Sequence, residues 1–181
     1  MPANPMVPTP RFVAANVATD RDRLIEINVE YVSWVLSQIE VVFGVPAAQV
    51  VGMTADEYVP AVIDKVCGAP PPKGIFYLVN VDDRLAAMGG LRLLGDGVGE
   101  IKRIYVRPGF RGMKLGDRIL TRLVADARAF GYRRLHLDTA PFMKAAQLLY
   151  EAHGFTERPP YEGVEVPPEF HARWRFMQRE L

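Results

Sequence analysis

Cysteine is nearly absent from this sequence: Cys67 is the only one among 181 residues. A single thiol excludes an intrachain disulfide and a metal site built from several thiolates. Serine is also scarce, and neither Ser33 nor Ser37 stands in a G-x-S-x-G motif, which sets serine hydrolysis aside. His136 and His153 are not at metal-ligand spacing with another histidine or cysteine, so we expect no metal.

Long apolar runs are missing as well. No stretch approaches the roughly 18 residues that cross a bilayer. The opening segment, MPANPMVPTP, has neither the basic nor the apolar region of a signal peptide. The sequence therefore predicts a cytoplasmic protein with no membrane partner. A net charge of +1 is not that of a general nucleic-acid binder, so no nucleic-acid partner is expected either.

The chain has the composition of one globular domain, with 49% apolar and 24% charged residues. Residues 1–10 carry four prolines and are predicted to form a mobile tail, which leaves a domain over residues 11–181. The oligomeric state is left open by the sequence, and a homodimer is one option.

Hydrophobic periodicity and turn residues predict an alternation of strands and helices in the second half of the chain. The first expected helix begins at an Asp20 cap and ends at Gly44. Three further helices are expected at 54–67, 114–130 and 145–153. Expected strands are 12–17, 75–79, 85–94, 98–106, 134–138 and 172–180, with a further one from Phe155 onward. The Gly89-Gly90 pair indicates a bulge or a close backbone approach. This order is that of an α/β fold with a mixed central sheet flanked by helices.

Positive charge is concentrated in residues 101–122. This segment holds one acid, Asp117, against seven basic residues: Lys102, Arg103, Arg107, Arg111, Lys114, Arg118 and Arg122. Its net charge is +6, which leaves −5 for the rest of the chain. The near-neutral total therefore conceals one local anion site, for which Arg111 and Lys114 are the best candidates.

The same segment reads as a strand, a glycine-containing loop and a helix. Backbone N–H groups at the start of a helix lack partners, and the helix dipole favours an anion there. Gly112 and Gly116 let a ligand approach the backbone because no Cβ intervenes. The pattern predicts a phosphate or pyrophosphate site. Neither the G-x-x-x-x-G-K-[ST] nor the G-x-G-x-x-G motif is present, so a P-loop or Rossmann nucleotide site is not indicated.

Two motifs are present instead. V-x-P-x-x-R-G-x-x-x-G spans Val106 to Gly116, and 34 residues further on Tyr150 opens a Y-x-x-x-G-F motif that ends at Phe155. In this order and spacing the chain resembles the GNAT superfamily of acetyl-CoA-dependent N-acetyltransferases. It departs from the family at Lys114, where the family has glycine, and at Met143, where asparagine is common.

The resemblance implies a single GNAT-like domain that binds acetyl-CoA. By this likeness the loop amides hold the CoA pyrophosphate and the strand beside them pairs with the pantetheine arm. A backbone N–H of that strand also polarises the thioester carbonyl. The implied cofactor-binding residues are Ile104, Tyr105, Val106, Arg111, Gly112, Met113, Lys114, Leu115 and Gly116.

Acetyl transfer to an amine needs one proton removed from the ammonium and one delivered to the departing thiolate. Tyr150 matches the family's usual acid, and Glu100, on the strand leading to the CoA site, is the candidate base or substrate anchor. Tyr31, Trp34 and Asp138 are candidate substrate contacts. No cysteine stands in a catalytic motif, so direct transfer in a ternary complex is expected.

The acceptor that we expect is a primary amine, either a small molecule or an amino acid. Two alternatives stay open at this point. The first is a non-catalytic acyl-CoA-binding or sensing module of the same fold. The second concerns the donor, because the sequence does not separate acetyl from longer acyl groups.

Overall fold

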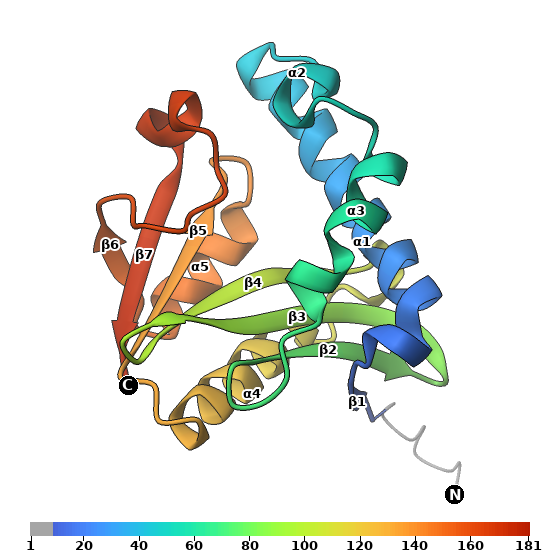
Figure 1. Cartoon of the computed structure of the whole chain (residues 1–181), viewed down its shortest axis with the longest axis vertical. Helices are drawn as coiled ribbons and strands as arrows, with labels where there is room; N and C mark the ends of the chain where they lie inside the picture. The colour runs from blue at the N-terminus through green and yellow to red at the C-terminus, as the bar shows by residue number, and fades with distance from the viewer. Residues whose placement is uncertain (1–8) are drawn as a thin grey trace, which may run out of the picture.

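The computed structural model describes residues 9–181, and Figure 1 shows their arrangement. The helices are α1 (Val17–Phe43), α2 (Ala47–Val51), α3 (Ala55–Cys67), α4 (Leu115–Ala129) and α5 (Lys144–Ala152), with short 3₁₀ turns η1 (Pro108–Phe110) and η2 (Pro168–Arg173). The strands are β1 (Arg11–Ala14), β2 (Gly74–Val81), β3 (Arg84–Gly95), β4 (Val98–Val106), β5 (Arg134–Thr139), β6 (Thr156–Arg158) and β7 (Arg175–Glu180). The mixed α/β class expected from the sequence is confirmed.

The seven strands of the described chain form one sheet in the order β1-β2-β3-β4-β5-β7-β6. Every neighbouring pair is antiparallel except β4 and β5, which are parallel. A parallel connection needs a crossover, and α4 supplies it between these two strands. In Figure 1 the two halves of the sheet diverge at this junction.

Each face of the sheet is covered by its own pair of helices. Leu24, Ile27, Val59 and Ile63, all fully buried, place α1 and α3 against one face. On the other face the apolar stripe of α4 packs beside α5. In these four helices the apolar residues recur at the spacing of an amphipathic helix. For this reason the sequence predicted the bounds of three of them to within about one residue. The two apolar cores hold the sheet from both sides.

The start of α1 differs from the expected one. Asn16, and not Asp20, is the N-cap: its side chain accepts a 2.8 Å hydrogen bond from the Ala18 amide. Asp20 accepts in turn from the Asn16 amide at 2.9 Å. This reciprocal pair satisfies two helix-end donors, so the strand before it ends at Ala14 and the helix begins at Val17.

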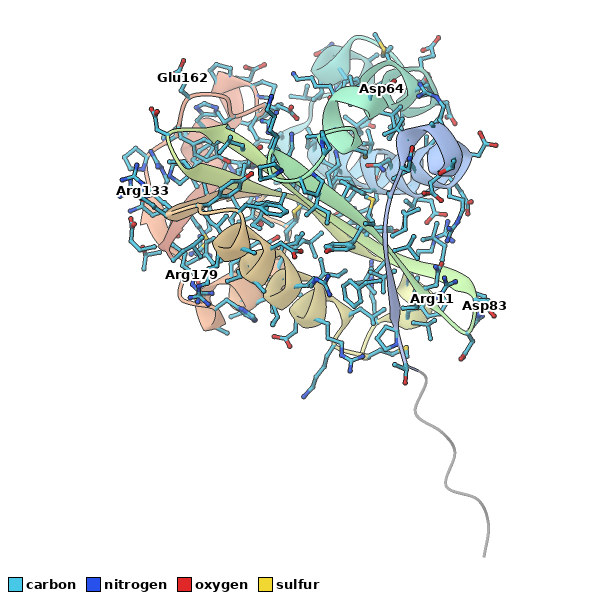
Figure 2. All side chains as sticks on the ribbon, turned by 60° about the horizontal axis from the view of Figure 1, so that its bottom comes forward. Arg11, Asp64, Asp83, Arg133, Glu162 and Arg179 are labelled. Atoms are coloured by element: carbon cyan, nitrogen blue, oxygen red, sulfur yellow. The ribbon has the colours of Figure 1, made fainter. Side chains whose placement is uncertain are left out.

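The expected hairpin is present, with Asp82 and Asp83 both at positive φ in its turn. Positive φ at both central residues fits the right-handed twist of the flanking strands. Arg11 of β1 lies 3.6 Å from Asp83, and Figure 2 shows the pair at the end of this hairpin. The register of β3 with β4 shifts between Met88 and Gly90, where Gly89 opposes both Arg103 and Ile104. The bulge therefore lies on β4, at Arg103, opposite the glycine pair and not within it. A Cβ on Gly90 would lie 2.4 Å from the Phe76 ring, so the expected close approach is present.

The expected tail falls largely on residues 1–8, which lie outside the described part of the chain. Thr9 and Pro10 precede β1. No single helix in residues 9–181 is long and apolar enough to cross a membrane; α1 meets that test only jointly with the segment Ala47–Cys67, across a bend of 109°.

Candidate active site

The central feature of the site is the separation of β4 from β5. The two strands pair only where Val98–Glu100 faces Arg134–His136. Beyond Glu100 the edge of β4 that faces β5 has no strand partner among the described residues. Backbone N–H and C=O groups left unpaired on a strand edge are available to an extended ligand.

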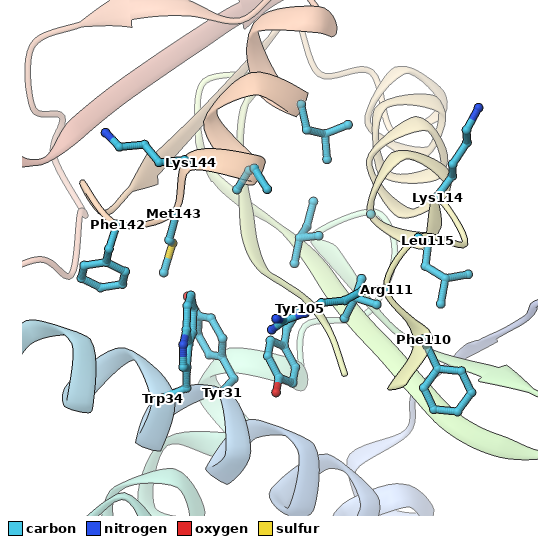
Figure 3. A pocket seen from close by; sticks show the side chains of 17 residues that line it. Tyr31, Trp34, Tyr105, Phe110, Arg111, Lys114, Leu115, Phe142, Met143 and Lys144 are labelled. Atoms are coloured by element: carbon cyan, nitrogen blue, oxygen red, sulfur yellow. The ribbon is translucent and has the colours of Figure 1, made fainter. Parts of the chain in front are cut away.

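A cavity of about 420 Å³ opens beside the free end of β4, and Figure 3 shows its lining. We call it the glycine-loop cavity. It is lined by eight of the nine residues predicted to bind the cofactor: Ile104, Tyr105, Val106, Arg111, Gly112, Lys114, Leu115 and Gly116. The ninth, Met113, does not line it and instead packs against the sheet core. The opposite side of the cavity is formed by Tyr31 and Trp34 of α1, by Phe142, which precedes α5, and by Lys144, the first residue of α5.

The loop that enters α4 is shaped by two left-handed residues. Gly112 has φ +86°, and Lys114, the N-cap of α4, has φ +55°. Glycine adopts such angles freely, whereas a residue with a Cβ is strained by about 1–2 kcal/mol. The family's preference for glycine at the position of Lys114 follows from this geometry. Because α4 has no side-chain cap, its first N–H groups remain free to bind an anion.

The seven basic residues of 101–122 fall into two groups. Four have protein partners: Arg107 bonds Glu26 and Glu30, Lys102 pairs with Glu165 and Glu100, Arg103 bonds Asn28, and Arg122 bonds Tyr77 and Asp126. The side chains of Arg111, Lys114 and Arg118 form no hydrogen bond or ion pair with any residue in 9–181. The cationic side chains of this segment that have no protein partner therefore lie in the loop and the first turn of α4, whereas Arg103 has only the neutral Asn28 as a partner.

Tyr150 lies near the C-terminal end of α5 and is only 7% exposed. Burial raises the pKa of its phenol well above the ordinary value, and the neighbouring Tyr31 and Asp138 raise it further. The rest of its motif fixes its place: Gly154 turns the chain at positive φ, and the Phe155 amide donates a 3.0 Å hydrogen bond back to the Tyr150 carbonyl. The Tyr150 side chain is absent from the lining of the glycine-loop cavity and packs in the core cluster that contains the apolar stripe of α4.

A second cavity, of about 320 Å³, lies beside the preceding segment of β4. We call it the α1–α2 cavity because those helices form its apolar wall. Ile101, Lys102 and Arg103 line it, whereas Ile104 to Val106 line the glycine-loop cavity. Tyr31 lines both. Successive segments of one strand therefore border two cavities that share this tyrosine.

Asp138, at the end of β5, faces the α1–α2 cavity. The Trp174 indole donates a 2.8 Å hydrogen bond to its Oδ1 atom. Burial raises the pKa of Asp138 to about 6, although the bond from Trp174 opposes the rise. Of the three predicted substrate contacts, Asp138 and Tyr31 line this cavity. Trp34 lines only the glycine-loop cavity, where its ring lies 5.7 Å from that of Phe142.

Glu100 occupies a different environment from the one expected of a base. It is 1% exposed and lines neither cavity. Arg92 donates to its Oε2 at 2.5 Å and the Tyr161 hydroxyl donates to its Oε1 at 2.9 Å. The Lys102 amine lies 3.7 Å away. Both carboxylate oxygens are thus engaged by neighbouring side chains.

Sequence reasoning missed Arg103, Glu165 and Trp174 as site residues. Glu165 and Trp174 follow β6, in a stretch that carries no motif, and they reach the site only because β7 pairs beside β5. Arg103 was assigned to the basic segment, but nothing in the sequence indicated that its backbone has φ +52°. A β-bulge at a non-glycine residue has no local sequence signal.

Comparison with known proteins agrees with this geometry. Residues 48–155 match the model of the acetyltransferase (GNAT) family. An uncharacterised N-acetyltransferase of Schizosaccharomyces pombe is 35% identical over 106 residues, which are 57% of this chain and 64% of that protein. An IAA acetyltransferase of Azospirillum brasilense is 40% identical over 65 residues, or 36% and 42% of the two chains. The chain spans less than two thirds of the length of these relatives.

Solved structures show the same fold. A GNAT-family acetyltransferase of Staphylococcus aureus superposes with a TM-score of 0.67 at 20% identity, over 96% of this chain and 99% of that one. A PaiA N-acetyltransferase of Thermoplasma acidophilum, in complex with coenzyme A, gives 0.63 at 16% identity over 96% and 99%. The family match covers more than half of the chain. The protein therefore belongs to the acetyltransferase (GNAT) family, as the motifs indicated.

Proposed function

We propose that this protein transfers an acetyl group from acetyl-CoA to a primary amine, by direct attack within a ternary complex. The observation that carries the proposal is the pair of cavities bordered by consecutive segments of β4 and joined at Tyr31. One cavity has the unpaired cations and free amides that a pyrophosphate needs, and the other has a carboxylate that attracts an amine. The N-acetyltransferase relatives support the same assignment.

In this proposal acetyl-CoA occupies the glycine-loop cavity. The amides at the start of α4, with Arg111 and Lys114, hold the pyrophosphate by charge-assisted hydrogen bonds. The pantetheine arm pairs with the free edge of β4 at Ile104–Val106, as an added strand would. A backbone N–H of this edge stabilises the oxyanion that forms when the thioester carbonyl is attacked.

The amine enters through the α1–α2 cavity, where Asp138 receives it. The Asp138 carboxylate takes a proton from the ammonium, and the free amine then attacks the thioester carbon. The C–N bond forms, the C–S bond breaks, and the thiolate accepts a proton from the Tyr150 phenol. Because burial keeps that phenol protonated, Tyr150 is a donor throughout the neutral pH range.

Glu100, the base indicated by the sequence, takes a positioning role in this mechanism. Its oxygens accept from Arg92 and Tyr161 and its charge faces Lys102, so it organises the cations of β3 and β4. Accepting a proton from an amine requires a free lone pair and access to the substrate, and Asp138 has the cavity access that Glu100 lacks.

The test is release of CoA thiol from acetyl-CoA in the presence of a panel of amines and amino acids, with the acetylated product identified by mass. We expect at least one amine to raise thiol release above hydrolysis. Tyr150→Phe should lower kcat by about 100-fold or more and leave the Kd for CoA unchanged. Tyr132→Phe is the matched control, because its hydroxyl bonds the Pro72 carbonyl away from both cavities.

Binding of CoA without amine-dependent release, and with no effect of Tyr150→Phe, would instead identify an acyl-CoA-binding module that does not catalyse transfer.

A further inference from the structure

Arg103 interrupts the regular conformation of β4. Its φ of +52° is left-handed, a region that residues with a Cβ rarely adopt. Such strain persists only where surrounding contacts enforce it, and it concentrates at functional sites. Adjacent side chains of a strand normally point to opposite faces of the sheet. Lys102 and Arg103 are adjacent in β4, yet both line the α1–α2 cavity. The bulge brings a second cation to this cavity.

The two cations differ in how their charges are compensated. Lys102 lies 2.9 Å from Glu165 and 3.7 Å from Glu100, so protein carboxylates balance its charge. Arg103 has no carboxylate within 4.0 Å among residues 9–181. Its Nη1 donates to the Asn28 side-chain oxygen at 2.7 Å. The hydrogen-bond partner is therefore neutral, although Glu165 lines the same cavity and Arg103 contributes to the lowered pKa of that carboxyl.

Asn28 is itself fixed. It is fully buried, and its side-chain nitrogen donates a 2.8 Å hydrogen bond to the Leu24 carbonyl one turn earlier in α1. The amide oxygen is therefore turned toward Arg103. A guanidinium has five N–H donors, and the contact with Asn28 uses one of them. The others remain available for bidentate binding of a carboxylate.

A negative charge faces the same cavity. Asp138, Arg103 and Tyr31 line the cavity together, and so does Glu165, which is paired with Lys102. Burial raises the pKa of Tyr31 to about 12, Arg103 lowers it, and Asp138 and Glu165 raise it. Much of the remaining wall is apolar, with Val35, Leu36 and Ile39 from α1, Val50 and Val51 from α2, and Phe170 from η2.

We propose that the acceptor is an α-amino acid with an apolar side chain, whose carboxylate binds Arg103 while its amine binds Asp138. This inference rests on the acetyl-transfer function proposed above. An α-amino acid carries both charges on neighbouring atoms and an apolar group beyond them, which matches the charges and the wall. A simple amine leaves Arg103 without a counter-charge, and a polyamine places a second cation against an apolar wall. At about 320 Å³ the cavity has the size of a small-molecule site.

The test uses matched pairs of acceptors that differ only by the carboxylate: L-phenylalanine with 2-phenylethylamine, and L-leucine with isopentylamine. We expect the wild-type protein to have a kcat/KM for the amino acid about 10- to 100-fold above that for the amine, as a charged hydrogen-bonded contact provides. Arg103→Met should bring this ratio close to one, and Arg103→Lys should restore part of it. Arg128→Met, which removes an exposed arginine of α4, should leave the ratio unchanged.

Binding provides a second readout that does not depend on turnover. Titration of L-phenylalanine into the protein saturated with CoA should show a complex that Arg103→Met weakens about 10-fold or more. The Kd of that variant for CoA serves as the check that it is folded.

Three outcomes separate the two proposals. A wild-type protein that acetylates no amine but binds L-phenylalanine through Arg103 overturns the enzymatic function and supports the ligand class. A wild-type protein that acetylates amines without preferring the carboxylated member of each pair overturns the inference and leaves the function standing. A preference that survives in Arg103→Met also overturns the inference, because another group must then bind the carboxylate.

Discussion

The indole nitrogen of Trp174 donates a 2.8 Å hydrogen bond to the carboxylate of Asp138, 36 residues earlier in the chain. The bond joins the end of η2 to the end of β5, and it is the one hydrogen bond to that carboxylate from residues 9–181. It favours the ionised form and opposes the effect of burial, which raises the pKa of Asp138 to about 6. The pair therefore sets the pH at which this carboxylate is ionised, which the proposed mechanism requires.

A pH profile tests this relationship. Asp138 must be ionised to accept a proton, so kcat/KM should fall as the pH drops through about 6. Trp174→Phe removes the bond that lowers the pKa, so the acidic limb should move to higher pH by about one unit. Asp138→Asn should remove most of the activity at every pH.

The charged and titratable groups around Asp138 are Tyr31, Glu100, Lys102, Tyr150, Tyr161 and Glu165. An acidic limb that does not move in Trp174→Phe would show that it does not report the ionisation of Asp138.

Replacement of Glu100 separates positioning from catalysis. Glu100→Gln leaves Arg92 and Lys102 without the buried charge that they face, and breaking such a pair typically costs about 3–5 kcal/mol of unfolding free energy. We expect that loss in urea unfolding, with kcat reduced by less than about 10-fold in the folded protein. Glu180→Gln breaks an exposed pair with Arg134 and should change stability by less than about 1 kcal/mol. A hundredfold loss of kcat at full stability would make Glu100 the base that the sequence indicated.

The close approach of the cofactor to α4 is tested at Gly116. A Cβ there would make ordinary contact with Leu149, at 3.4 Å, and would project into the glycine-loop cavity. Gly116→Val should therefore keep the Tm near that of the wild type and raise the Kd for CoA about 10- to 100-fold, as steric overlap of about 1–3 kcal/mol implies. Gly109→Val is the control, because a Cβ at Gly109 meets nothing within 4 Å and that residue does not line the cavity. Equal CoA affinity in both variants would move the pyrophosphate away from this loop.

Replacing either of two arginines, four residues apart, with methionine should have opposite effects on thermal stability and on CoA affinity. Arg107 is held by Glu26 and Glu30 of α1 and by the Leu85 carbonyl, so Arg107→Met should lower the Tm by about 2–8 °C and leave CoA affinity unchanged. Arg111 has no partner in the described chain and lines the glycine-loop cavity. Arg111→Met should weaken CoA binding about 10-fold at an unchanged Tm. Thermal unfolding and CoA titration of both variants test these two roles. Loss of CoA affinity in Arg107→Met would contradict a purely structural role for Arg107.

Local signals in the sequence were sufficient for most elements. The Thr54–Glu57 capping box, the turn at Asp82-Asp83 and the apolar stripe of α4 each act within a few residues, and all are present in the structure. The exceptions are also instructive. Asp20 is a good cap residue, but Asn16 lies where the chain leaves β1 and so takes that place. The short helix α2 was not predicted, because its five residues carry no periodicity and no side-chain cap.

The single cysteine, the concentration of charge in residues 101–122 and the two motifs were determined by the sequence alone, because each is a property of residue type and spacing. They were enough to indicate the family and the loop that we propose binds an anion. Which of those charges are free depended on the tertiary structure, since Glu26, Glu30 and Glu165 reach Arg107 and Lys102 only through packing of distant elements. The same holds for the α1–α2 cavity, where we propose that the acceptor binds. A bulge at Arg103, the separation of β4 from β5 and the return of Trp174 to Asp138 are long-range pairings, for which the local sequence contains no signal.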